Sequence, residues 1–149
     1  MHIETLDFLL ANISHLHHMR AHQLLEALGL YRGQPPVLFE LWEREGLTQA
    51  ELAERLHITP ATMTRMLQRM EKSGFICRKP DETDQRVTRV YLTDSGRAVR
   101  AQLEKVWAQM EAETFAGFSE DERPVLRSWL KRIRANLLAV SADKFGDDE

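Results

Sequence analysis

The sequence is poor in cysteine and contains no long apolar run. A single cysteine among 149 residues excludes an internal disulfide, as is typical of proteins in a reducing compartment. No stretch approaches the roughly 20 consecutive apolar residues that a membrane-spanning helix needs. The N-terminal stretch MHIETLDFLL lacks the basic start of a secretory signal and carries Glu4 and Asp7. We therefore expect a cytoplasmic protein without a membrane partner.

The sequence also lacks the residue patterns of an enzyme. It has no glycine-rich loop that would cradle a nucleotide phosphate, and Ser14 and His15 have no recognisable orienting acid. Neighbouring residues on a helix point about 100° apart, so these two side chains diverge. We expect no catalytic residue, no resident metal and no cofactor. With 43% apolar and 29% charged residues and no internal repeat, the chain fits one domain, or one domain with an appended dimerisation region.

The middle of the chain carries the signals of two short helices joined by a tight turn. Thr48 and Glu51 have the spacing of a capping box, in which a hydroxyl and a carboxylate satisfy free amides at a helix start. Thr59 precedes Pro60, and proline is favoured at the first helical position. Residues 57–58 leave room only for a turn. Helix, turn and helix at this spacing is the geometry that places one helix in the major groove of DNA.

The second of these helices is expected to bury one face and to expose the other. Its apolar residues share one side at helical spacing and should pack inward: Met63, Met66, Leu67 and Met70. The opposite side combines small, hydrogen-bonding and cationic residues: Ala61, Thr64, Arg65, Gln68, Arg69 and Lys72. Arginine and glutamine can pair bidentately with guanine and adenine edges. Gly74 should end the helix in the left-handed conformation. Taken alone, the helix also fits an ordinary packing unit with a polar surface.

A β-hairpin is predicted directly after this helix. Residues 75–79 and 87–92 are β-rich, and residues 80–86 form a polar, turn-forming loop between them. Such a wing can rest on the DNA backbone while its tip enters the adjacent minor groove. The negative potential of a narrow minor groove favours an arginine there. Arg86 is the candidate, and we expect Asp84 to fix its direction.

Positive charge is concentrated in this region although the whole chain is acidic. The chain has a formal net charge of −3. Residues 55–89 contain eight Lys or Arg and four Asp or Glu, so this segment carries +4 and the remainder carries −7. A basic helix and wing on an acidic body is the charge distribution expected of a protein that contacts phosphates.

Four motifs occur in an order that matches a known family. They are Glu51-Leu52-Ala53, Glu71-Lys72-Ser73-Gly74-Phe75-Ile76, Asp84-Gln85-Arg86 and Leu92-Thr93-Asp94-Ser95-Gly96. Together they resemble the MarR family of bacterial winged helix-turn-helix transcription regulators. The resemblance implies a mainly α fold with a small β-hairpin wing, and a homodimer that binds a palindromic operator in double-stranded DNA. It also implies a repressor that a small phenolic or carboxylate ligand releases from DNA.

Within this fold, we expect DNA bases to be read from the start and the outer face of the second helix, through Thr59, Ala61, Thr62, Thr64, Arg65 and Gln68. We expect phosphate contacts from Arg69, Lys72, Arg78 and Lys79, and the minor-groove contact from Arg86 with Asp84. The alternative is a winged-helix module that binds protein and no specific DNA. Such modules usually lose the basic surface that this chain keeps.

The flanking segments are expected to form a helical dimerisation region. It comprises residues 1–30 and 98–149, around a winged helix-turn-helix domain at residues 31–97. The last helices are too apolar for one chain of this size to bury, which indicates an oligomer interface. A twofold dimer would place two recognition helices about one DNA turn apart.

Cap residues and apolar spacing predict the bounds of the flanking helices. Residues 5–28 should form one helix, with a buried stripe made of Leu6, Leu10, Ile13, Leu16, Leu24, Leu25 and Leu28. A second helix should start at Gln34 and end before Gly46. Thr93 should cap a helix that runs to about residue 115. Ser119 and Glu122 should cap the final helix.

Two clusters in the first helices have more than one interpretation. In the resembled family, a small-ligand cavity often lies near the dimer region, and His17, Arg20, Phe39 and Trp42 are candidates to line it here. Core packing is the more common use of such aromatic residues. His15, His18 and His22 lie on one helix face, where i, i+4 histidines can hold a metal. A solvated polar face is the simpler interpretation of these histidines, and Cys77 is expected to be a small apolar strand residue without a redox role.

Overall fold

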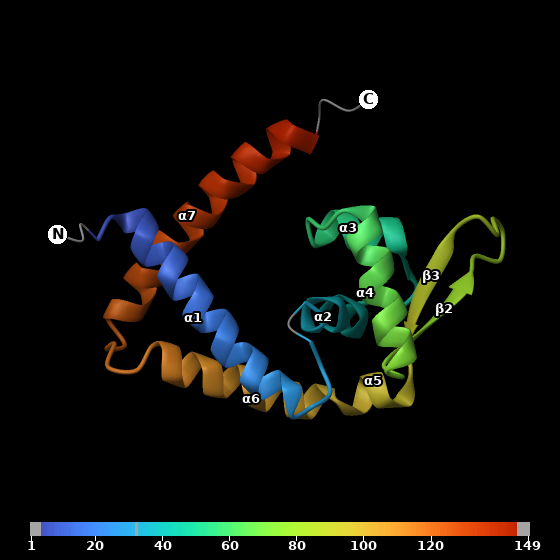
Figure 1. Ribbon diagram of the computed structural model, residues 1–149, viewed down its shortest axis with the longest axis horizontal. Helices are drawn as coiled ribbons and strands as arrows, with labels where there is room; N and C mark the ends of the chain where they lie inside the picture. The colour runs from blue at the N-terminus through green and yellow to red at the C-terminus, as the bar shows by residue number, and fades with distance from the viewer. Residues whose placement is uncertain (1–3, 32, 146–149) are drawn as a thin grey trace. The chain divides into compact units, whose positions relative to one another are not determined.

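The structure, a computed structural model, describes residues 4–31 and 33–145. It is mainly helical with one small sheet, as predicted (Figure 1). Its elements are α1 (Leu6–Glu26), α2 (Pro35–Glu43), β1 (Leu47–Thr48), α3 (Gln49–Arg55), α4 (Pro60–Lys72), β2 (Ile76–Pro80), β3 (Thr88–Leu92), α5 (Asp94–Ala98), α6 (Arg100–Thr114) and α7 (Glu122–Phe145). The chain divides into two compact units, residues 1–114 and 115–149. In the described part of the chain, no helix combines the length and the apolar character needed to cross a bilayer.

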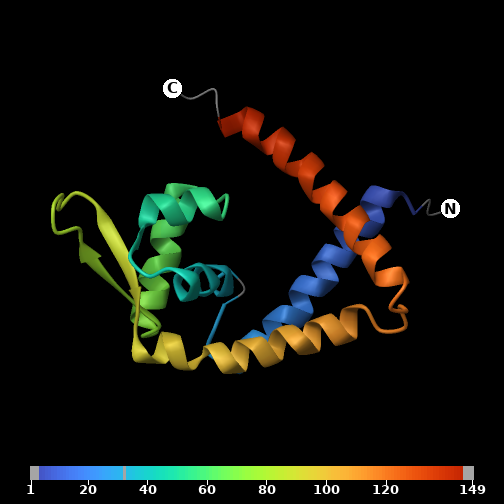
Figure 2. The same ribbon diagram turned by 180° about the vertical axis from the view of Figure 1, so that it is seen from behind.

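The sheet has three antiparallel strands in the order β1-β3-β2. β3 is central: its residue Leu92 lies opposite Ile76 of β2, and its residue Val90 lies opposite Leu47 of β1. Figure 2 shows β2 and β3, in yellow-green, extending as a hairpin away from α4, which confirms the predicted wing. The sequence does not predict β1, because two residues are too few to show an alternating pattern.

Side-chain caps hold both helices of the helix-turn-helix. The Thr48 hydroxyl accepts from the Glu51 amide at 3.0 Å, and the Glu51 carboxylate accepts from the Thr48 amide at 3.1 Å, so the predicted capping box is present. The Thr59 hydroxyl accepts from the Thr62 amide at 3.3 Å at the start of α4. Gly74 follows α4 with a φ of 87°, the left-handed conformation in which glycine is favoured. These ends follow from local chemistry, and the sequence predicts them correctly.

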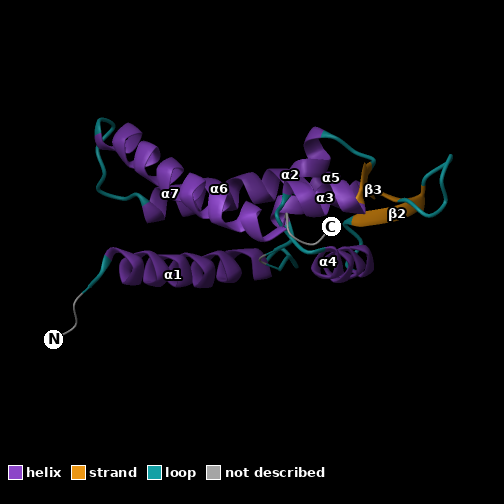
Figure 3. Ribbon diagram, turned by 90° about the horizontal axis from the view of Figure 1, so that it is seen from above, coloured by secondary structure: helices purple, strands orange, loops and turns teal. Residues whose placement is uncertain are grey.

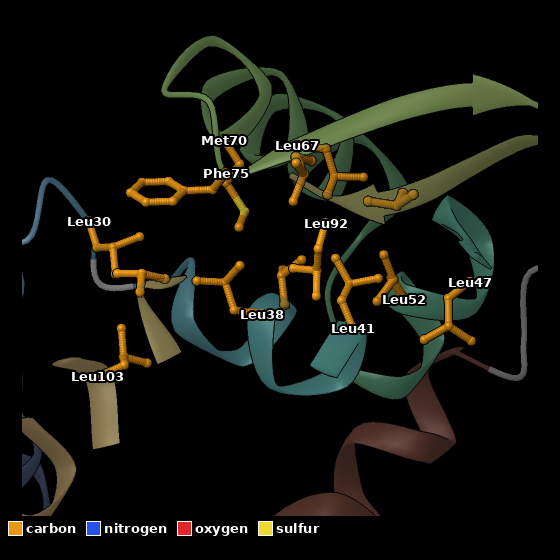
Figure 4. Close-up of a cluster of buried hydrophobic side chains, with 14 of the residues drawn as sticks. Leu30, Leu38, Leu41, Leu47, Leu52, Leu67, Met70, Phe75, Leu92 and Leu103 are labelled. Carbon is orange, nitrogen blue, oxygen red and sulfur yellow. The ribbon is translucent and has the colours of Figure 1, made fainter. Parts of the chain in front are cut away.

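The hydrophobic core of unit 1 lies between α2, α3, α4 and the sheet. Figure 4 shows side chains from these elements pointing toward one another, among them Leu38, Leu52 and Leu67. The predicted inner face of α4 is confirmed, because Met63, Leu67 and Met70 are fully buried and Met66 is partly buried. Burying one such side chain stabilises the fold by about 1.5–3 kcal/mol. The core therefore fixes which face of α4 is turned to solvent.

Helix α1 lies beside α6 (Figures 1 and 3) and leaves most of its predicted apolar stripe exposed. Leu25 is buried, but Leu6 is 88% exposed and Ile13 and Leu16 are each more than half exposed. The N-terminal part of the stripe is therefore not covered within one chain, and its burial against a second subunit stays a prediction. The reason is that α6 covers only one side of α1, so spacing alone cannot say which apolar residues are covered.

The helix predicted over residues 93–115 is divided in two. Thr93 caps α5 as predicted, and its hydroxyl accepts from the Gly96 amide at 3.1 Å. α5 then ends at Ala98, and α6 begins at Arg100. Val99, between them, is buried. The short α5 contacts the sheet, whereas α6 runs along α1, so the two helices follow different packing partners.

Unit 2 consists of α7 and the turn before it. The Ser119 hydroxyl accepts from the Glu122 amide at 3.2 Å, and the Glu122 carboxylate accepts from the Ser119 amide at 3.0 Å, which confirms the second predicted capping box. Leu126 of α7 is half-buried, whereas seven other large apolar side chains of this helix are each between 38% and 65% exposed: Val125, Trp129, Leu130, Ile133, Leu137, Leu138 and Val140. Within this unit alone, the apolar stripe of α7 faces solvent.

Candidate nucleic-acid interface

The outer face of α4 presents the polar side chains that the sequence assigns to base reading. Ala61, Arg65 and Gln68 are exposed, as are Arg69 and Lys72 toward the end of the helix. The opposite face is buried in the core, so these side chains are held on a rigid support. Arginine and glutamine side chains of this kind can pair with base edges in a DNA major groove.

The threonines of α4 are already used in part by the helix itself. The hydroxyls of Thr59 and Thr62 lie 3.0 Å apart in a hydrogen bond at the N-cap. Thr64 is half-buried, and its hydroxyl donates to the Pro60 carbonyl at 3.0 Å. A hydroxyl whose proton is committed to the helix can still accept a hydrogen bond. Thr59 and Thr64 therefore keep only acceptor capacity, whereas Thr62 accepts from Thr59 and keeps its own hydroxyl proton. Arg65 adds donors, and the amide of Gln68 adds both donors and an acceptor.

The wing tip presents Arg86 to solvent. Its side chain is 91% exposed, and its Nε donates to an Asp84 carboxylate oxygen at 3.1 Å. The Arg86 backbone amide donates to the same oxygen at 3.1 Å. The expected pairing of Asp84 with Arg86 is thus present, and it limits the directions in which the guanidinium can point.

The wing loop is organised by Asp81, which the sequence analysis did not identify. Its carboxylate accepts from the Thr83 hydroxyl at 2.7 Å and from the amides of Thr83 and Asp84. It also pairs with the guanidinium of Arg89, which in turn donates to the Gly46 carbonyl at 2.7 Å. The Thr83 hydroxyl and Arg89 hold the pKa of Asp81 well below its usual value. Arg89 was missed because its partners are eight and 43 residues away, a distance that no local pattern spans.

The basic residues at the base of the wing have partners within the chain. The Arg78 guanidinium contacts the carboxylate of Glu71 and the side chain of Gln49. Lys79 is exposed, and its amine lies 5.4 Å from the centre of the Tyr91 ring. The structure therefore places Arg78, an expected phosphate contact, in an intramolecular ion pair, while Lys79 remains at the surface.

A network of close contacts joins the end of α4 to α5. The Thr93 hydroxyl donates to the Gly74 carbonyl, and the Thr93 amide donates to the Phe75 carbonyl at 3.1 Å. On the other side, the indole N–H of Trp42 donates to the Gly96 carbonyl at 2.9 Å. Gly96 also packs so closely that an added Cβ would lie 2.1 Å from the Phe75 carbonyl oxygen. The orientation of the recognition helix is therefore linked to α5 and α2.

The four candidate ligand residues fall into separate contacts. Phe39 and Trp42 lie together with their ring centres 5.2 Å apart, and Phe39 is also 5.2 Å from the ring of Trp107. Arg20 on α1 instead forms a bidentate pair with Glu113 on α6, with both N–O distances 2.8 Å. His17 is exposed on α1. Within residues 4–31 and 33–145, we find no hydrogen bond or ring contact that joins His17 or Arg20 to the aromatic cluster.

The histidine spacing on α1 does not produce a metal cluster in the structure. Among the described residues, no three His, Cys, Asp or Glu side chains come together in an arrangement suited to a metal ion. His15 and His22 are exposed, and Cys77 is half-buried with a free thiol.

Comparison with known proteins matches the sequence motifs to one family. The sequence model of the MarR family matches residues 30–88. The uncharacterized HTH-type transcriptional regulator YdgJ of Bacillus subtilis is 30% identical over 114 residues, which cover 76% of this chain and 70% of YdgJ. The organic hydroperoxide resistance transcriptional regulator of Bacillus subtilis is 39% identical over 77 residues, which cover 52% of each protein.

Solved structures agree with the sequence comparison. A crystal structure of MarR superposes with a TM-score of 0.80 at 29% identity, covering 96% of this chain and 99% of that one. The crystal structure of the transcriptional regulator SlyA superposes with a TM-score of 0.78 at 28% identity, covering 90% of this chain and 92% of that one. The packing of α1 beside α6 and the winged domain therefore both have counterparts in known transcription regulators.

Proposed function

This chain belongs to the MarR family of transcriptional regulators, and from that premise we propose that it is a homodimeric repressor of a palindromic operator. The exposed face of α4 carries this proposal. Arg65 and Gln68 lie on a helix whose other face is buried, so they are presented in a fixed direction. Arg86 at the wing tip extends the same basic surface. α4 would read a major groove, and the wing would enter the adjacent minor groove.

The dimer follows from apolar surface that one chain leaves uncovered. In unit 1, Leu6, Ile13 and Leu16 of α1 are more than half exposed, and in unit 2 the stripe along α7 is exposed. Contiguous apolar surface of this kind usually marks a protein interface. We therefore assign residues 1–30 and 98–149 to dimerisation and residues 31–97 to DNA binding, with a second copy of the chain as the partner.

A small phenolic or carboxylate ligand would relieve repression by favouring a dimer whose recognition helices are wrongly spaced. It can do so only through a difference in its affinity for the two states. Phe39 and Trp42 supply an aromatic wall, and His17 and Arg20 supply polar groups near the α1–α6 region. Because the Trp42 indole also holds α5, a ligand that displaced this contact would act directly on the support of α4.

Selection of DNA from a random pool by the purified full-length protein tests the proposal. We expect enrichment of a palindrome whose half-sites lie about 10 base pairs apart, bound by a protein of twice the chain mass. Equal binding to selected and scrambled DNA would refute specific recognition and would favour the winged-helix module that binds protein. A monomer that binds one half-site would refute the dimer alone. We expect this regulator to act in the cytoplasm, where its DNA target lies, and to have no enzymatic activity.

A further inference from the structure

We infer that Arg78 and Glu71 form a positioning pair that fixes the wing against the recognition helix, and that Arg78 does not itself contact DNA. This inference rests on the proposed DNA-binding function. It assigns a role to Glu71, an acidic residue on a surface that faces DNA. It also changes the role of Arg78. The charge of this residue and its place at the base of the wing predict a phosphate contact.

The pair is held by several hydrogen bonds that join three elements. The backbone amide of Arg78 in β2 donates to a Glu71 carboxylate oxygen at 3.1 Å, and its Nη2 donates to the other oxygen at 3.1 Å. Its Nε adds a longer contact of 3.4 Å, and Nη1 donates to the amide oxygen of Gln49 at 3.2 Å. Glu71 lies in the last turn of α4, and Gln49 is the first residue of α3. One guanidinium therefore ties the wing to both helices of the helix-turn-helix.

Two of the three arginines of the hairpin, Arg78 and Arg86, differ in exposure, and this difference separates their roles. The Arg78 side chain is only 22% exposed, whereas that of Arg86 is 91% exposed. To reach a DNA phosphate, Arg78 would have to leave its bidentate pair with Glu71. The Glu71 carboxylate would then face the negatively charged DNA backbone without a partner. The hydrogen bonds from Arg78 lower the pKa of Glu71, so this carboxylate stays charged near neutral pH. Breaking the pair to contact DNA is therefore unfavourable.

Apolar packing cannot fix the direction of the wing by itself. Along β2, Ile76 is buried, the next two residues are half-buried, and the last two are exposed. In β3, Val90 and Leu92 are buried, so the hydrophobic anchor of the hairpin reaches no further than Val90, which lies opposite Arg78. Polar contacts at Arg78, at the outer end of this anchor, are placed to limit rotation of the hairpin. A small rotation at this point would move the tip out of the minor groove.

The substitution Glu71→Gln gives the sharpest test, because the two roles predict effects of opposite sign. If Arg78 positions the wing, removing the charge of Glu71 weakens the pair, and operator affinity falls roughly tenfold. If Arg78 were a phosphate contact restrained by Glu71, the same change would free it and raise affinity. Glu82→Gln is the matched control, because it removes an equal charge from an exposed wing residue outside the pair. We expect Glu82→Gln to leave affinity unchanged or to raise it slightly.

Coupling to the wing tip distinguishes positioning from a general loss of stability. Arg86→Ala should weaken operator binding by the wild-type protein, but it should cost little more in a protein that already carries Glu71→Gln or Arg78→Gln. Hydroxyl-radical footprints should lose the same minor-groove protection in all three single variants. Circular dichroism and thermal unfolding would show that each variant is folded at the temperature of the binding assay. Additive effects of Arg86→Ala and Glu71→Gln would overturn the inference.

The two levels of the proposal fail in different ways. Binding of wild-type protein to selected and scrambled DNA with equal affinity would contradict the proposed function. Specific binding by wild-type protein together with tighter binding by the Glu71→Gln variant would overturn the positioning role alone. The proposed function and the positioning role are both supported if the wild-type protein binds specifically and if Glu71→Gln and Arg78→Gln each weaken that binding, with no further loss when Arg86→Ala is added.

Discussion

Replacing Gly96 by alanine should destabilise the protein although alanine is the better helix former. In α5, an added Cβ would lie 2.1 Å from the Phe75 carbonyl oxygen and 3.1 Å from a Leu92 methyl carbon. Real Cβ atoms do not approach a backbone oxygen so closely, so α5 would have to move away from Phe75 and Leu92. That movement would strain the hydrogen bonds from Thr93 to Gly74 and from the Trp42 indole to Gly96.

The magnitude follows from opposing terms. Overpacking at a rigid contact costs about 1–3 kcal/mol. Weakening two or three hydrogen bonds adds about 0.5–1.5 kcal/mol for each bond that is lost. The higher helix propensity of alanine returns about 1 kcal/mol. The net expectation for Gly96→Ala is a loss of about 2–4 kcal/mol in the free energy of unfolding, or about 10 °C in Tm for a chain of this length.

Urea unfolding followed by circular dichroism would measure this loss. Because the proposed dimer would add to stability, all variants must be compared at one protomer concentration. Ser95→Ala, at the preceding exposed position of α5, is the matched control and should change stability by less than about 0.5 kcal/mol. A Gly96→Ala protein as stable as wild type would show that helix propensity dominates and that the approach of α5 to the Phe75 carbonyl is not tight.

Three further predictions follow from individual contacts. Arg65→Ala should cost about 1–3 kcal/mol in operator binding and relax the base preference. Lys72→Ala should instead weaken binding to all DNA sequences similarly and lower the slope of log affinity against log salt concentration by about 1. Binding measured at several salt concentrations would show the difference. Trp42→Phe keeps an aromatic ring but loses the indole donor, so we expect the free energy of unfolding in urea to fall by about 1 kcal/mol. We also expect this variant to respond more weakly to ligand in the operator-binding assay. The ion pair with Arg20 on α1 lowers the pKa of Glu113 to about 2. The stability that this pair contributes is therefore complete above the ordinary glutamate pKa of 4.5 and is lost as the pH falls toward 2. Acid unfolding of the Glu113→Gln variant should lack that part of the pH dependence.

Local chemistry explains which parts of the fold the sequence could predict. The caps at Thr48, Thr59 and Ser119 depend on residues three positions away, so their patterns are visible in the chain. The inner face of α4 is equally visible, because burial follows helical spacing. The pairing of Asp84 with Arg86 is also local, since the two residues are two positions apart. These predictions need no knowledge of the tertiary structure.

Contacts between distant segments explain the rest. The partners of Arg89 include Gly46, which lies 43 residues away, and the Trp42 indole meets a carbonyl 54 residues away. No sequence period reports such a pairing. The stripe on α1 shows a different limit, because a pattern of apolar residues predicts burial without saying which chain provides the cover. The role of Arg78 falls between these cases, since its charge was visible but its partner was not.

The contacts also change how the basic charge of residues 55–89 should be understood. Three of its acidic residues, at positions 71, 81 and 84, each pair with an arginine of the same segment. Two of those arginines, Arg78 and Arg89, are held at the base of the wing, whereas Arg86 remains almost fully exposed at the tip. The acidic residues therefore do not simply oppose DNA binding, because they shape the wing that carries Arg86. The positive charge of this segment that remains available to DNA is then carried by the outer face of α4, by the exposed Lys79 and by the wing tip. We therefore expect that neutralising an acidic residue of this segment weakens recognition wherever that residue holds an arginine in place.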